Sequence, residues 1–250
     1  MRILAEGSVC GCMWRIAEED TRMALTLNPD GGDTVIDVPK SEDYFEMWPW
    51  LSFRHIHEIK TVTARGTVHV LGCAACMFFD MSGCRSFGLE NLDTSGVKTM
   101  EQMFGSCRSV EKLSGLAGWD VSSVEDMGCM FSDCPSLSDI SALAGWDVSS
   151  TADMSFMFNH CRSLTDISPL AGWDTGRVRN MAGMFADSGI SDLSPLSAWN
   201  TSSAENMNFM FFLCPGLTDA SPVRNWNVRN VKYMDLIFNS FWFNDPFTHK

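Results

Sequence analysis

The chain has 250 residues, 45% of them hydrophobic, and a formal net charge of −13 at pH 7. This composition suffices for one large domain with a sizeable core. The negative balance disfavours nucleic acid and anionic membrane surfaces as partners, because both require clustered Lys and Arg. No stretch approaches the roughly 18–20 apolar residues of a membrane span, and residues 1–12 hold no apolar segment typical of a signal peptide. We therefore expect no membrane span.

Residues 1–66 differ from the rest of the chain and predict a β-rich N-terminal cap. Strands are predicted at residues 13–16, 23–27, 35–38 and 59–63, the last in register with the sheet of the repeats. Residues 41–54 are rich in aromatic side chains, namely Tyr44, Phe45, Trp48, Trp50 and Phe53. We interpret this aromatic segment as part of the cap, because a repeat stack needs its open end covered. A ligand pocket is the alternative.

Residues 67–240 contain about six to seven units of one repeat. The phrase that begins Trp-Asp-Val-Ser-Ser at Trp119 and Trp146 returns with few changes until the sequence ends. Its anchors fall at steps of 26 or 27 residues, at Leu92, Trp119, Trp146, Trp173, Trp199 and Trp226. A fixed period of this length predicts a solenoid, in which stacked units bury a continuous core that no single unit could form.

Each repeat predicts a short helix followed by a short strand. Met127, Met130, Phe131 and Cys134 stand at i, i+3, i+4 and i+7, which places them on one face of a helix. The Leu-x-x-Ile segment that follows predicts a strand leading into a tight Ser-Pro-Leu turn. The predicted fold is therefore an α/β repeat solenoid of the leucine-rich-repeat type, with parallel strands on one face and helices on the other. The structural anchors expected in its core are Trp119, Trp146, Trp173, Trp199, Trp226, Met127, Met154, Met181, Phe131, Phe158, Phe185, Cys107, Cys134, Cys161 and Cys214.

Residues 241–250 form an aromatic C-terminal tail that departs from the repeat. It contains Phe241, Trp242, Phe243 and Phe247. We expect these side chains to shield the exposed edge of the last repeat. A swapped or dimeric contact is the alternative, and we expect a monomer.

The string Asp-[Thr/Val]-Ser-x-Val-x-x-Met-x-x-Met-Phe-x-x-Cys-x-Ser-Leu resembles the BspA-like leucine-rich-repeat surface proteins of bacteria. These proteins are also known through the mycoplasma-type lipoprotein repeat. Residues 164–172, Leu-Thr-Asp-Ile-Ser-Pro-Leu-Ala-Gly, are similar to internalin-type leucine-rich repeats. The resemblance is strong over residues 70–240. It implies a location at the cell surface or outside the cell, and a role in adhesion or in binding host proteins. Because residues 1–12 show no signal-peptide pattern, we expect either that the given chain begins after a leader or that the protein stays in the cytoplasm.

The repeated cysteines favour core packing over chemistry. They share their row with Ser188 and Phe241, swaps that a framework of essential disulfides would not tolerate. Apolar surroundings raise the pKa of a thiol, so a cysteine nucleophile beside His160 is disfavoured. Zinc at Cys10, Cys12, Cys73 and Cys76, or a metal at residues 55–58, is the less favoured alternative. We expect no enzymatic activity, no metal and no cofactor.

Two rows of acidic residues recur through successive repeats. One row, Asp139, Asp166, Asp192 and Asp219, is a candidate ligand-facing surface for calcium or a basic ligand, and turn formation is the alternative. The other follows the anchors at Asp93, Asp120, Asp147, Asp174, Asn200 and Asn227. We interpret this second row as structural, because Asn and Asp both accept backbone N–H groups at turns.

The sequence therefore predicts a non-catalytic binding module. Its exposed sheet face would engage a protein or a glycan, and solvent-facing residues that vary between repeats, such as Lys112 against Asp139 and Asp166, would carry specificity. Two alternatives stay open at this point. One is a structural spacer of the cell surface, and the other is an intracellular interaction scaffold or effector.

Overall fold

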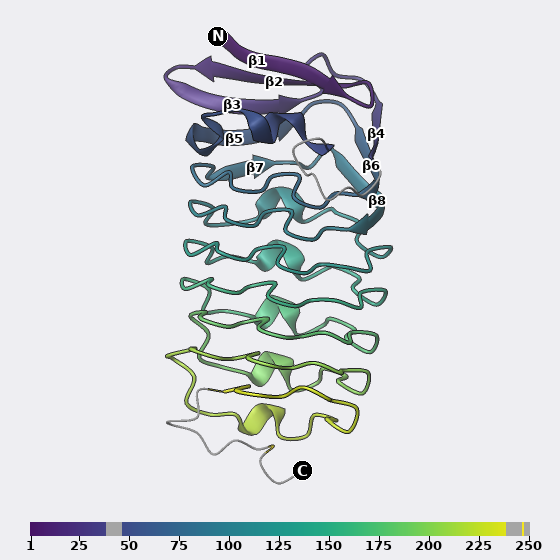
Figure 1. The fold of residues 1–250 in the computed structure, drawn as a ribbon, viewed down its shortest axis with the longest axis vertical. Coiled ribbons are helices and arrows are strands. Elements are labelled where there is room, and N and C mark those ends of the chain that lie inside the picture. The colour runs from purple at the N-terminus through teal and green to yellow at the C-terminus, as the bar shows by residue number, and fades with distance from the viewer. Residues whose placement is uncertain (39–46, 239–246, 248–250) are drawn as a thin grey trace.

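The computed structural model describes residues 1–38, 47–238 and 247 of the chain. Figure 1 shows an elongated molecule in which successive turns of the backbone lie one above another along the long axis. Residues one repeat apart pair in parallel, so that Asp126 bridges Asp153 and Asp153 bridges Asn180. The fold is thus a mixed structure with parallel pairing between repeats.

Two sheets begin at the N-terminus. The first has the strand order β1-β2-β3-β5-β7 and the second the order β4-β6-β8. The pairs β1–β2 and β2–β3 are antiparallel, whereas every later pair of these two sheets is parallel. The strands are β1 (Arg2–Val9), β2 (Cys12–Glu19), β3 (Arg22–Leu27), β4 (Thr34–Val38), β5 (Ile59–Ala64), β6 (Val68–Cys73), β7 (Ser86–Gly88) and β8 (Leu92–Thr99). The four predicted strands are confirmed, and β1 is one that the sequence analysis did not predict.

The aromatic segment packs on the first turns of the stack. Trp48 and Trp50 are fully buried, and their indole N–H groups donate to the carbonyl oxygens of Ala75 at 2.6 Å and Met77 at 2.8 Å. Tyr44 and Phe45 of the same prediction lie outside the described residues. The pairing of β4 with β6 crosses the predicted domain boundary at residue 66, which stays a prediction.

The helices predicted over the Met-Met-Phe-Cys segments are wrong. Residues 127–134 form a tight arc of turns instead, in which Cys129 and Asp133 take the left-handed backbone conformation at φ +54° and +57°. The N–H groups of Cys129 and Phe131 donate to carbonyl oxygens of the next repeat at 2.7 and 3.0 Å. The N–H groups of Met130 and Ser132, in contrast, bond within the arc at 3.2 and 3.0 Å. A two-turn helix is unstable alone in water, and bonds to the next repeat replace part of its ladder.

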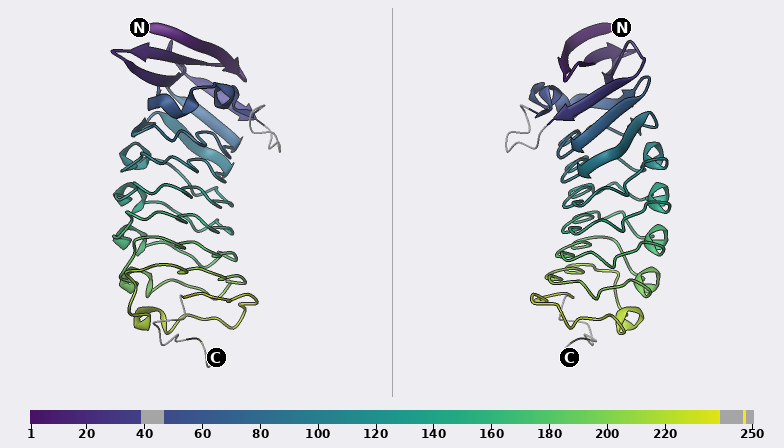
Figure 2. Two further views of the ribbon diagram at one scale, coloured as in Figure 1. Left: turned by 60° about the vertical axis from the view of Figure 1, so that its left-hand side comes forward. Right: turned by 90° about the vertical axis from the view of Figure 1, so that its right-hand side faces the viewer.

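The helical turns of the repeats lie at the segment predicted as a turn. Within residues 67–238, which the structure describes throughout, each helix is a 3-10 helix of three residues. They are η3 (Ser114–Leu116), η4 (Ser141–Leu143), η5 (Ser168–Leu170), η6 (Ser194–Leu196) and η7 (Ser221–Val223), after η1 (Pro49–Ser52) and η2 (Ile56–Glu58) in the N-terminal part. These five turns align along one side of the stack (Figure 2). The strand predicted before them is reduced to the bridge from Lys112 to Asp139.

The predicted anchors form the core in continuous rows, and each exposes 7% or less of its surface. Phe131 and Phe158 stack with ring centroids 5.6 Å apart, and Trp119 and Trp146 stack at 6.4 Å with planes 2° apart. Stacked aromatic pairs contribute about 0.5–1.5 kcal/mol each beyond the area they bury. Because like residues meet at most steps, the repeat period itself positions the core.

The last described aromatic residue extends the phenylalanine row. Phe247 is buried and stacks on Phe238 with centroids 6.3 Å apart and planes 7° apart. The tail thus supplies a ring where a further repeat would supply one. The other aromatic residues of the predicted tail, Phe241, Trp242 and Phe243, lie outside the described residues. Among the described residues, no helix has the length and apolar character needed to cross a membrane.

Candidate binding groove

The acidic row proposed to face a ligand lies at the start of the 3-10 turns. Each of its carboxylates is exposed and accepts the backbone N–H of the serine two residues later, as Asp139 does from Ser141 at 2.9 Å and Asp166 from Ser168 at 2.8 Å. Asp192 and Asp219 repeat this contact. Hydrogen bonds from that serine, through its hydroxyl and its backbone N–H, lower the pKa of all four carboxyls. The row therefore has a turn-forming task.

The second acidic row does the same at a different turn. Asp147 accepts the N–H of Ser149 at 3.0 Å, and Asn200 accepts the N–H of Ser202 at 3.1 Å. The structural interpretation of this row is confirmed. A third row, Asp126, Asp153, Asn180 and Asn206, repeats the contact at the parallel bridges. There the amide of Asn180 also donates to the carboxylate of Asp153 at 2.9 Å.

The cysteine row is buried, and its thiols hold repeats together. Cys161 donates from Sγ to the carbonyl oxygen of Phe131 at 3.2 Å, and Cys134 does so to Phe104 at 3.3 Å. Burial raises the pKa of Cys134 to about 12 and that of Cys161 well above its usual value. Such thiols form little thiolate at neutral pH.

The other candidate chemical groups do not converge. His160 is exposed and shares a hydrogen bond of 2.8 Å with Asp133, whereas its neighbour Cys161 is buried. His55 pairs instead with Glu58 at 2.8 Å. Across the described ranges 1–38, 47–238 and 247, no group of three or more His, Cys, Asp or Glu side chains is placed to hold a metal ion.

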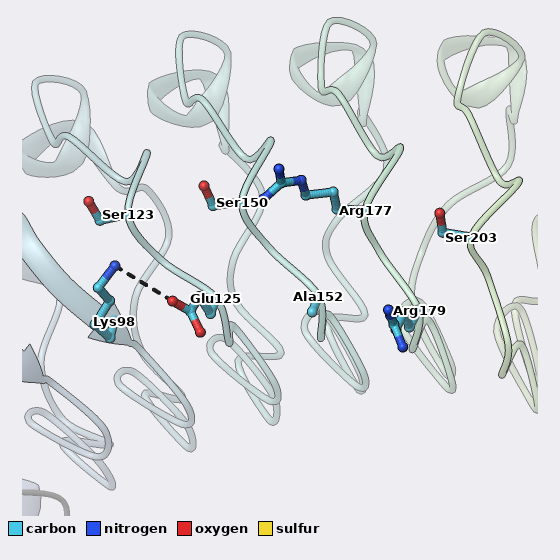
Figure 3. A pocket seen from close by; sticks show the side chains of 8 residues that line it. All are labelled: Lys98, Ser123, Glu125, Ser150, Ala152, Arg177, Arg179 and Ser203. Carbon is cyan, nitrogen blue, oxygen red and sulfur yellow. Dashed lines mark ion pairs between the residues drawn. The ribbon is translucent and has the colours of Figure 1, made fainter.

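Polar side chains from several successive repeats line a hollow on the surface of the stack (Figure 3). This hollow has a volume of about 410 Å³ and is lined by Lys98, Ser123, Glu125, Ser150, Ala152, Arg177, Arg179 and Ser203. A second hollow of about 280 Å³ shares Arg179 and Ser203 with it, and adds Ser202, Glu205, Asn230 and Lys232. The two hollows together are called the polar groove below.

Two columns of side chains make the walls of the polar groove. One column is Lys98, Glu125, Ala152, Arg179, Glu205 and Lys232, and the other is Ser123, Ser150, Arg177, Ser203 and Asn230. Each column takes one residue from each repeat. Because neighbouring strands lie about 4.8 Å apart, the longer column spans roughly 24 Å. The groove therefore suits an extended ligand rather than a compact one.

Charge in the polar groove is predominantly positive, although the whole chain carries −13. Lys98 pairs with Glu125 at 3.6 Å, and Arg179 pairs with Glu205 at 3.5 Å. Lys232 also pairs with Glu205, and its hydrogen bond and charge, with the charge of Arg179, lower the pKa of that carboxyl. The lining residues thus hold four cations and two carboxylates, and three of the cations pair with the carboxylates.

Arg177 is the cation without a partner. Its side chain is exposed, and it makes no hydrogen bond or ion pair with any part of the chain that the structure describes. Figure 3 shows its guanidinium extending back towards Ser150. A guanidinium presents a planar set of donors that matches carboxylate, sulfate and phosphate oxygens. This place in the groove is suited to an anion.

The backbone along the polar groove is already hydrogen-bonded. Ala152 donates its N–H to the carbonyl of Glu125 at 2.8 Å, and Arg179 donates to Ala152 at 2.8 Å. The same bond joins Glu125 to Lys98 and Glu205 to Arg179. A ligand here therefore meets side chains and not a free strand edge.

Comparison with known proteins decides the family. Residues 74–194 and 165–249 match the family described as "Mycoplasma protein of unknown function, DUF285". The chain belongs to this family. The match spans more than half the chain and agrees with the mycoplasma-type part of the resemblance stated above. The BspA-like and internalin-type parts of that resemblance stay predictions.

No curated protein and no solved structure matches the chain. The family's printed description assigns no function. The groove, the rows and their contacts are therefore the grounds on which a function for this family member is proposed.

The residues of the polar groove were not predicted from the sequence. Solvent-facing residues that vary between repeats were expected to carry specificity, but the positions chosen were Lys112, Asp139 and Asp166. The same signal was present one column away, where the position before the third acidic row reads Lys98, Glu125, Ala152, Arg179, Glu205 and Lys232. That column varies in charge and size while its flanking residues repeat.

Proposed function

We propose that this protein is a non-catalytic binding module whose polar groove holds an extended protein or glycan ligand. The observation that carries the proposal is the unpartnered Arg177 within a groove shared by several repeats. A column that changes charge from repeat to repeat, on a scaffold that otherwise repeats, is the arrangement by which stacked repeats vary their binding surface.

The remaining chemistry supports binding over catalysis. The thiols with raised pKa values lie in the core, and His160 contacts carboxylates on the surface. A catalytic nucleophile needs an activating base within hydrogen-bond reach. The groove offers guanidinium, ammonium, carboxylate and hydroxyl groups, which position a ligand through hydrogen bonds and charge.

The resemblance adds two finer proposals. We place the stack among leucine-rich-repeat-like solenoids and assign it an adhesion-type role at the cell surface or outside the cell. Fractionation of native cells followed by immunodetection tests the location. Recovery of the protein solely from the cytoplasm would favour an intracellular scaffold and reject the surface assignment.

Ala152 gives a sharp test of the groove. Its column holds Lys, Glu and Arg in other repeats, so the fold tolerates a large side chain there. Ala152→Trp should fill the groove without disturbing the core. Ala144→Trp is the matched control, because Ala144 is exposed near η4 and lines neither hollow.

The full chain and both variants would be assayed on an array of neutral and acidic glycans and against a library of displayed peptides. We expect saturable binding to members of one array, lost in Ala152→Trp and kept in Ala144→Trp. Circular dichroism melts would establish that both variants fold. Absence of saturable binding from both arrays, or binding that survives Ala152→Trp, would reject the proposed function.

A further inference from the structure

We infer that the ligand of the polar groove is an acidic polysaccharide, bound through its carboxylate or sulfate groups, with Arg177 and Arg179 as the central anion contacts. This inference rests on the proposed function and narrows it to one class of ligand. It assigns Lys98 and Lys232 to the two ends of the same track, and Ser150 and Ser203 to the ligand's hydroxyl groups.

The sign of the charge is the first argument. The lining residues hold four cations and two carboxylates in a chain of net charge −13, so the groove is a locally positive track on an acidic protein. Both carboxylates are already paired with cations, Glu125 with Lys98 and Glu205 with Arg179 and Lys232. Among the described lining residues, Arg177 is the cation whose guanidinium donors are all free to bind a ligand. Its position therefore marks where an anionic group of the ligand binds.

The spacing of the cations is the second argument. Arg177 and Arg179 lie in one repeat, Lys98 three repeats before Arg179 and Lys232 two repeats after it along the same column. At about 4.8 Å per repeat these intervals are roughly 14 and 10 Å. A single anion cannot reach these positions together. A polymer that carries anionic groups at intervals along its length can.

The polar lining is the third argument, and it favours a polysaccharide over an acidic peptide. Protein–protein contacts draw most of their affinity from apolar and aromatic anchors in desolvated pockets. The lining residues offer no such anchor, and Ala152 is their single apolar member. The bonded backbone also gives an extended peptide no ladder to join. Hydroxyl groups of a polysaccharide, by contrast, can donate to side-chain oxygen atoms along one wall. The donor groups of Ser203 and Asn230 already bind the carbonyl oxygens of Gly176 and Ser202, so these two side chains offer acceptors.

The test measures binding of the full chain to four polymers at equal concentration of monomer units. They are heparin, which is sulfated; polygalacturonate, which is carboxylated; dextran, which is neutral; and poly-L-glutamate, an acidic peptide. We expect saturable binding to heparin or polygalacturonate, weakened by salt because exposed charges are screened. Dextran should not bind. The comparison of the two acidic polysaccharides identifies sulfate or carboxylate as the preferred anion.

Variants place the binding in the groove. Arg177→Gln should weaken binding about threefold to fivefold, the effect of one exposed charge contact. Arg108→Gln, at an exposed arginine outside the groove lining, should leave it unchanged. Ala152→Glu should weaken binding and Ala152→Lys should strengthen it, whereas the same two changes at Ala144 should have little effect.

Three results would overturn the inference. They are equal binding of dextran and the acidic polysaccharides, tighter binding of poly-L-glutamate than of either polysaccharide, and equal affinities of Ala152→Glu and Ala152→Lys. Any of these, together with loss of array binding in Ala152→Trp, would leave the groove as a binding site with a different ligand. The failure of this inference is thus separable from the failure of the proposed function.

Discussion

The thiol of Cys161 lies 3.2 Å from the carbonyl oxygen of Phe131, thirty residues earlier in the chain. The same contact joins Cys107 to Phe78, Cys134 to Phe104 and Cys214 to Phe185. Each thiol therefore links two repeats through a backbone acceptor inside the core. A cysteine here acts as a small apolar side chain that also donates one hydrogen bond.

Removing this donor should destabilise the stack more than replacing it. Cys161→Ala leaves a small cavity and a carbonyl without its thiol donor, at a cost of about 1–3 kcal/mol. Cys161→Ser keeps a donor and should cost less, and Ser188 shows that the row accommodates serine. Chemical denaturation measures both free energies of unfolding. Equal losses for the two variants would contradict a role for the hydrogen bond.

Alkaline pH should destabilise the protein through its buried thiols. Burial raises the pKa of Cys84 and Cys134 to about 12, against 9.0 for an unburied thiol. Above pH 9 the unfolded chain loses these protons while the folded chain keeps them. The stabilisation from the thiols is therefore complete below about pH 9 and declines from there towards pH 12. Melting temperatures between pH 8 and 11 test this, and Cys134→Ser should flatten the decline.

The aspartates of the 3-10 turns should be replaceable by asparagine. Asp139→Asn keeps the side-chain oxygen that accepts the N–H of Ser141, whereas Asp139→Ala removes it. We expect a loss of about 1 kcal/mol for alanine and a much smaller loss for asparagine. Thermal melts measure the difference. If calcium raised the melting temperature of the parent chain but not of Asp139→Asn, the turn-forming interpretation would be insufficient.

The left-handed positions of the arcs should respond differently to substitution. Gly183 has φ +59°, and a Cβ there would lie 2.3 Å from the ring of Phe156. Gly183→Ala should therefore destabilise the chain by about 1–3 kcal/mol. The equivalent residue Cys129 already carries a side chain at φ +54°, so Cys129→Gly should change stability little. Denaturant midpoints compare the two, and a neutral Gly183→Ala would show that the arc relaxes.

The arcs also show where prediction from the sequence failed. Met127, Met130, Phe131 and Cys134 satisfy a helical pattern and are all buried, so their burial was predicted correctly. Their backbone conformation was predicted wrongly. The left-handed positions, such as Cys129, are mostly not glycine here, so the sequence gives no local sign of a left-handed residue. The deciding bonds run to Ser155 and Met157 of the next repeat, beyond any local window.

The polar groove likewise could be predicted from the sequence only in part. Arg177 and Arg179 are two residues apart in one repeat, and the sequence shows that both positions vary. Their relation to Lys98 and Lys232 depends on how the repeats stack, which brings residues 26 or 27 apart into one column. The acidic rows were easier to find because four successive repeats carry Asp at the same position, and this regularity reflects a shared turn.

By itself the sequence determined the repeat period, the rows that fill the core and four of the N-terminal strands, β2 to β5. These follow from hydrophobic burial and period, which are local properties of the chain. The tertiary structure decided the arcs, the 3-10 turns and the polar groove. The physical reason is that every buried backbone N–H group needs an acceptor, and in the arcs alternate N–H groups find theirs in the next repeat.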